Sequence, residues 1–97
     1  MSDVIKLNYP AMNEMAQQCK ATSQRLLETV RLAQQIAQEM QNGALVGDAG
    51  EAFSNAILSA FVPSVNKLSQ KFEEIAKDIA AAISDMQAQD RGAAGHF

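Results

Sequence analysis

Two long series of mainly apolar residues, each spaced by threes and fours, dominate the sequence and restrict what it can fold into. The first series consists of Met12, Met15, Cys19, Thr22, Leu26, Val30, Ala33, Ala37 and Met40. The second series consists of Phe61, Val65, Leu68, Phe72, Ile75, Ile79, Ile83 and Met86. This spacing keeps the series on one side of an α-helix. The sequence therefore predicts two long amphipathic helices and an all-α fold.

The only strong interior breakpoint lies between the two series, where glycines are concentrated. Gly43 can adopt the left-handed conformation that ends a helix. Asp48 stands three residues before Glu51, which is the spacing of a capping box at a helix start. We therefore predict a single domain over 1–97 that forms an antiparallel helical hairpin. Its predicted parts are helix one at about 9–41, a turn at 42–48, helix two at about 49–90 and a flexible tail at 91–97.

Pro63 lies inside the predicted second helix. In a helix interior, proline removes one backbone hydrogen bond and costs about 3 kcal/mol unless the helix bends around it. We predict a kink near Pro63, because the apolar series continues in phase beyond it. A complete break, which would give three helices, is the alternative.

Two long helices cover only one stripe of each other, and further apolar residues flank both series. The economical way to cover them is to pack two hairpins into a four-helix bundle. We therefore predict a dimer. The residues predicted to pack within the hairpin or the dimer are Leu26, Val30, Phe61, Val65, Leu68, Phe72, Ile75 and Ile79.

The charge distribution excludes nucleic acid as a partner. The formal net charge is -3, and no basic stripe is present that could release counterions from phosphates. No apolar run approaches the length of a membrane span, and no signal-peptide pattern opens the chain, so we expect neither. A membrane-active helix is a weaker interpretation, because the polar faces lack the dense lysine and arginine that anionic lipid attracts.

Catalytic and metal-binding residues are too sparse for an enzyme. The chain has one histidine, His96, and one cysteine, Cys19, far apart in the sequence. Neither a nucleophile with an oriented base nor a set of metal ligands can be assembled from them. We therefore expect a non-enzymatic protein without a cofactor, a metal or a small-molecule substrate.

The segment between the helices carries a family resemblance. It runs Gly43-Ala44-Leu45-Val46-Gly47-Asp48-Ala49-Gly50-Glu51-Ala52-Phe53. With the length and the two helices, it resembles the WXG family, the early secreted antigen-like substrates of bacterial type VII secretion. Leu45, Val46 and Gly47 stand where the family has Trp-Xaa-Gly. Met86 and Asp90 have the spacing of the family's export signal, Tyr-Xaa-Xaa-Xaa-Asp or Glu, with methionine in place of tyrosine.

The resemblance implies a four-helix-bundle dimer that a type VII secretion ATPase exports in the folded state, without a cleaved signal peptide. The dimer partner is then a second copy of the chain or a related WXG-family protein that supplies the missing aromatic residues. An intracellular coiled-coil adaptor that binds partner helices is the rival interpretation. The absence of both aromatic residues favours this rival.

Overall fold

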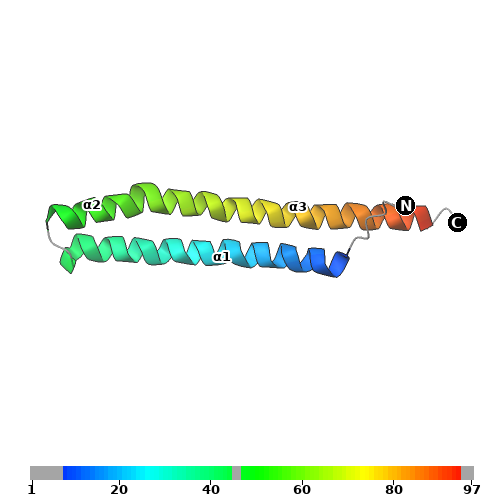
Figure 1. The fold of residues 1–97 in the computed structure, drawn as a ribbon, viewed down its shortest axis with the longest axis horizontal. Coiled ribbons are helices and arrows are strands. Elements are labelled where there is room, and N and C mark those ends of the chain that lie inside the picture. Colours follow the sequence, from blue (N-terminus) through cyan, green and yellow to red (C-terminus); the bar gives the residue numbers. More distant parts are fainter. Residues whose placement is uncertain (1–7, 45–46, 95–97) are drawn as a thin grey trace, which may run out of the picture.

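The protein is a rod made of two long antiparallel helices, as Figure 1 shows for the computed structural model, which describes residues 8–44 and 47–94. The rod measures 75 × 26 × 17 Å along its principal axes. The predicted all-α hairpin is confirmed. Its elements are α1 (Tyr9–Glu39), the closing turn η1 (Met40–Ala44), α2 (Asp48–Ala56), the π-helical turn η2 (Ile57–Phe61) and α3 (Val62–Ala94).

The start of α1 is fixed by a side-chain cap. The Asn8 side chain accepts a hydrogen bond from the Ala11 backbone N–H at 3.0 Å, which satisfies one of the N–H groups left unpaired at a helix start. Pro10 occupies the first turn, where its missing N–H is not needed. The helix continues into η1, where Gly43 leaves the helical region with φ 105° and ψ 6°.

The second helix begins differently from the prediction. Gly47 is the N-cap residue, with φ 93° and ψ −161°, and no side chain caps the helix. The predicted capping box is therefore wrong, because Asp48 already lies inside the first turn and cannot act as the cap. Asp48 and Glu51 still place negative charge at the helix N-terminus, where the helix dipole favours it.

Pro63 does not divide the second helix. The backbone of Ala56, Ile57 and Val62 is right-handed helical, so α2, η2 and α3 follow one another without a break. The irregularity is the π turn η2, in which the Val62 N–H donates to the Ile57 carbonyl five residues earlier. The helix also ends later than predicted, because α3 continues to Ala94 through part of the expected flexible tail. Residues 95–97 of that tail lie outside the described residues.

The π turn keeps one face of the helix in register. Along α3, buried residues recur every seven positions, beginning at Val62. In α2, the buried residue on the same face is Ser54, which lies eight positions before Val62. A π turn contains one residue more than an α-helical turn, so it absorbs the extra position. The buried row consists of Ser54, Val62, Ser69, Ala76 and Ile83.

Small residues dominate the contact between the two helices. Ala37 is completely buried, and the side chains of Ser23, Ser54 and Ser69 are buried with it. Ser69 Oγ donates to the Ser23 carbonyl at 2.9 Å, and the two hydroxyl oxygens are also 2.9 Å apart. Since the Ser69 proton is used for the carbonyl, the Ser23 hydroxyl donates to Ser69 Oγ. Small side chains let the helix backbones approach closely, and these hydrogen bonds satisfy the buried Ser23 and Ser69 hydroxyls, while the Ser54 hydroxyl donates to the Ala37 carbonyl at 3.4 Å.

Candidate protein-binding surface

Large apolar side chains remain exposed along the rod. Among the described residues, nine are between 39% and 57% exposed: Met15, Leu27, Leu32, Ile36, Phe53, Leu58, Phe61, Leu68 and Ile75. Exposure of single apolar residues is ordinary, but a contiguous set marks an interaction surface. Whether these nine residues form an interaction surface therefore depends on their arrangement on the helices.

Four of these residues form one row, which we call the apolar stripe. Phe61, Leu68 and Ile75 follow one another at intervals of seven, and Phe53 lies eight positions before Phe61 across the π turn η2. Seven residues make almost two full helical turns, so residues at this interval lie along one side of the helix. Each member of the apolar stripe precedes a member of the buried row by one position. The stripe therefore borders the contact between the helices.

The predicted packing residues divide between two locations. Val30 is buried and Leu26, Val65, Phe72 and Ile79 are partly buried, whereas Phe61, Leu68 and Ile75 are exposed. The hairpin itself therefore does not bury the last three. The second apolar series of the sequence therefore forms two neighbouring rows on the helix. Its steps of three and four residues alternate, so successive members of the series fall in one row and then in the other.

The opposite side of the hairpin carries a groove of mixed lining. The groove has a volume of about 560 Å³ and runs between α1 and α3. Its lining combines the polar residues Asn13, Gln17, Lys20, Ser23, Gln24, Glu73 and Lys77 with Ala16, Leu27, Ala76 and Ala80. Lys77 follows Ile75 by two residues, or about 200° around the helix, so the groove and the apolar stripe face different ways. Lys77 pairs with Glu73 at 3.5 Å, an exposed ion pair of the kind that contributes little to stability.

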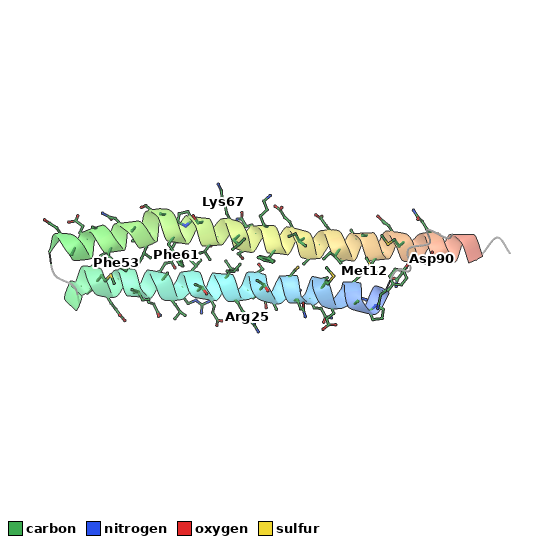
Figure 2. All side chains as sticks on the ribbon, viewed as in Figure 1. Met12, Arg25, Phe53, Phe61, Lys67 and Asp90 are labelled. Carbon is green, nitrogen blue, oxygen red and sulfur yellow. The ribbon has the colours of Figure 1, made fainter. Side chains whose placement is uncertain are left out.

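Charged side chains also mark the outer edges of the rod. Figure 2 shows Arg25 and Lys67 pointing away from the opposite helix, on the two edges of the hairpin. Both residues are exposed. The apolar stripe is thus bounded by a solvated edge on one side and by the helix contact on the other.

The predicted turn motif is only partly described. Leu45 and Val46 lie outside the described residues, and Gly47 is the N-cap of α2. A Cβ atom added at Gly47 would meet no atom within 4 Å, but the backbone φ of 93° belongs to a region that other residues rarely adopt. Gly47 is therefore required for its backbone conformation and not for close packing.

The predicted export signal has an unexpected partner. Asp90 is exposed near the end of α3, and Met86, one turn earlier, is partly buried. Asp90 Oδ2 accepts a hydrogen bond from the Tyr9 hydroxyl at 2.7 Å, although the two residues are 81 positions apart. This bond, with smaller effects from desolvation and the Asp90 charge, raises the pKa of Tyr9 above its ordinary value. No local sequence pattern links these residues, so sequence analysis did not identify Tyr9.

Within residues 8–44 and 47–94, no three histidine, cysteine, aspartate or glutamate side chains lie together as metal ligands would. None of the helices in that part of the chain combines the length and the apolar character of a membrane span.

The chain was also compared with known proteins. The family WXG100, described as proteins of 100 residues with WXG, matches residues 4–91. Comparison with curated proteins and with solved structures finds no match. Proteins of the WXG100 family are non-enzymatic, are typically substrates of type VII secretion and commonly form homodimers or heterodimers. Since the match covers nearly the whole helical hairpin, the chain belongs to the WXG100 family.

Proposed function

We propose that this chain is a small protein-binding dimer that serves as a substrate or co-secreted partner of a bacterial type VII secretion system. The observation that carries the proposal is the apolar stripe on a hairpin of the WXG100 family. The partner across the stripe is a second copy of the chain or a related member of the family. Two hairpins then form a four-helix bundle, and the type VII secretion ATPase is the partner in export.

Burial of the stripe supplies the driving force for association. Its four members are between 44% and 53% exposed in the single hairpin. Full burial of a leucine, isoleucine or phenylalanine side chain contributes about 1.5–3 kcal/mol, so covering the exposed half of each contributes about 1 kcal/mol. The hairpin is only 17 Å thick along its shortest axis and offers no third layer to cover them. A second hairpin provides that layer.

The dimer is tested by placing a charge in the stripe. Leu68→Glu removes the free energy gained by burying this leucine, about 1 kcal/mol in each copy. In a symmetric dimer the loss occurs twice and amounts to about 2 kcal/mol. The dissociation constant should therefore rise by about thirtyfold or more, since 2 kcal/mol corresponds to that factor. Gln70→Glu is the matched control, because it adds the same charge at an exposed position two residues further along α3. Light scattering after size exclusion, over a dilution series, measures the mass.

The outcomes separate the possible partners. A parent chain of twice the monomer mass, dissociated by Leu68→Glu and not by Gln70→Glu, supports the homodimer. A parent chain that is monomeric alone but dimeric when co-expressed with a related family member supports the heterodimer. A Leu68→Glu chain that keeps the parent's mass at every dilution refutes the role of the stripe.

Export is proposed to depend on the turn and the end of α3. Leu45, Val46 and Gly47 form the recognition turn, and Met86 with Asp90 forms the export signal. The test compares culture supernatant with cell pellet for the parent and for Asp90→Ala, in a host that carries a type VII system. A cytosolic enzyme controls for lysis. A parent chain that reaches the supernatant while Asp90→Ala stays inside supports both the secretion role and the signal.

An intracellular coiled-coil adaptor is the second candidate function. The chain favours it in one respect, because Leu45 and Met86 replace the tryptophan and tyrosine of the family motifs. In that function the apolar stripe binds a helix of another protein. A parent chain that stays in the cells with the whole secretion system present would support the adaptor.

A further inference from the structure

The hydrogen bond between Tyr9 and Asp90 joins the two ends of the hairpin. Tyr9 is the first residue of α1 and Asp90 lies in the last turns of α3. Figure 2 shows Asp90 at the end of the rod that is far from the turn, close to the start of α1. Side chains of a helix tilt toward its N-terminus. The Tyr9 side chain therefore extends along α3 toward its C-terminal end.

The pair presents two chemical groups to a partner. The distance of 2.7 Å is typical of a hydroxyl that donates to a carboxylate. Among the described residues, Tyr9 is the only one that donates a hydrogen bond to the Asp90 side chain, and it uses one carboxylate oxygen. The other oxygen can accept from a protein that approaches this end. An exposed carboxylate beside an aromatic ring suits an arginine or lysine, which bonds the carboxylate and packs on the ring.

We infer that Tyr9 is a specificity-determining residue of the export signal, and that its ring and the Asp90 carboxylate are recognised together by a cationic surface of the secretion apparatus. This inference rests on the proposed function. Met86, one turn before Asp90, offers no aromatic ring, and Tyr9 provides one from the other end of the chain. Recognition then depends on the fold, because only a hairpin with α1 paired along α3 brings the two groups together.

The test measures export of four variants in a host that exports the parent. Tyr9→Ala removes the ring, Tyr9→Phe removes only the hydroxyl, and Asp90→Ala removes the carboxylate. Asp85→Ala is the matched control, since Asp85 is also an exposed carboxylate on α3. Circular dichroism and thermal unfolding of the purified variants show that each keeps the parent's helices. We expect Tyr9→Ala and Asp90→Ala to lose export, Tyr9→Phe to retain part of it, and Asp85→Ala to match the parent.

The results distinguish this inference from the proposed function. Export of Tyr9→Ala at the parent's level, with Asp90→Ala retained in the cells, overturns the role of Tyr9 and leaves the proposed function intact. Equal loss for Tyr9→Ala and Asp85→Ala also overturns it, because the effect is then not specific to the pair. A parent chain that is never exported overturns the proposed function, and the inference with it.

Discussion

Replacing Ser69 by alanine tests what holds the two helices in close contact. Ser69 is 2% exposed, and its hydroxyl both donates to the Ser23 carbonyl and accepts from the Ser23 hydroxyl. The substitution removes both bonds and leaves the Ser23 hydroxyl without an acceptor inside the interface. A buried unpaired hydroxyl costs about 1–3 kcal/mol, whereas alanine gains about 0.5 kcal/mol in helix propensity. We expect the free energy of unfolding to fall by about 0.5–2.5 kcal/mol.

The matched control is Ser64→Ala on the same helix. Ser64 is exposed, and its hydroxyl donates to the Ala60 carbonyl within the helix at 2.8 Å. This substitution should leave the free energy of unfolding unchanged or raise it by about 0.5 kcal/mol, through helix propensity alone. Urea unfolding followed by circular dichroism measures both variants. All samples need the same protein concentration, because the stability of a dimer, the state proposed for this chain, depends on it.

A double variant makes the test stricter. Ser23→Ala with Ser69→Ala removes the donor and the acceptor together, so no unpaired hydroxyl remains. Its destabilisation should be smaller than the sum of the two single substitutions, which is the sign of a direct interaction. Equal unfolding midpoints for Ser69→Ala and Ser64→Ala, or strict additivity in the double variant, would refute the reasoning.

Three further outcomes follow from the structure. Because the chain has one tyrosine and no tryptophan, alkaline absorbance titration reports on Tyr9 alone, and its pKa should exceed 10.0 in the parent and return toward that value in Asp90→Ala. The raised pKa means that this bond stabilises the fold below pH 10.0 and is lost as the pH rises through the folded-state value. Gly47→Ala should lower the free energy of unfolding by about 1–3 kcal/mol in urea titration, through backbone strain alone. Ala37→Leu should cost about 1–3 kcal/mol in the same assay by overpacking the helix contact, while Ala21→Leu at an exposed position should be nearly neutral.

The hairpin was predictable because its signals are local and repeated. Apolar spacing over many turns defines both helices, and Gly43 marks the end of the first. The start of the second helix was predicted with the wrong cap, because Asp48 and Glu51 have the spacing of a capping box. The N-cap residue is Gly47, whose backbone conformation no spacing pattern reveals.

The candidate surfaces were predictable only in part. Spacing by threes and fours cannot separate two neighbouring rows, so the apolar stripe and the partly buried residues appeared as one series. The serine pair was missed because serine in a helix usually indicates a solvated position, and only the close approach of the helices gives Ser23 and Ser69 their role. The contact of Tyr9 with Asp90 depends on the relative position of the two helix ends, which no pattern within one helix contains.

The π turn η2 lets the second helix lose one residue while it presents the same surface. Because this turn holds one residue more than an α-helical turn, deletion of a single residue within Ile57–Phe61 can restore regular α-helix without rotating α2 relative to α3. Phe53 would stay in line with Leu68 and Ile75. A deletion within α3 would instead turn every following side chain by about 100° and break both rows. We therefore expect the helix to tolerate a one-residue deletion within Ile57–Phe61, just before Pro63, better than one within α3.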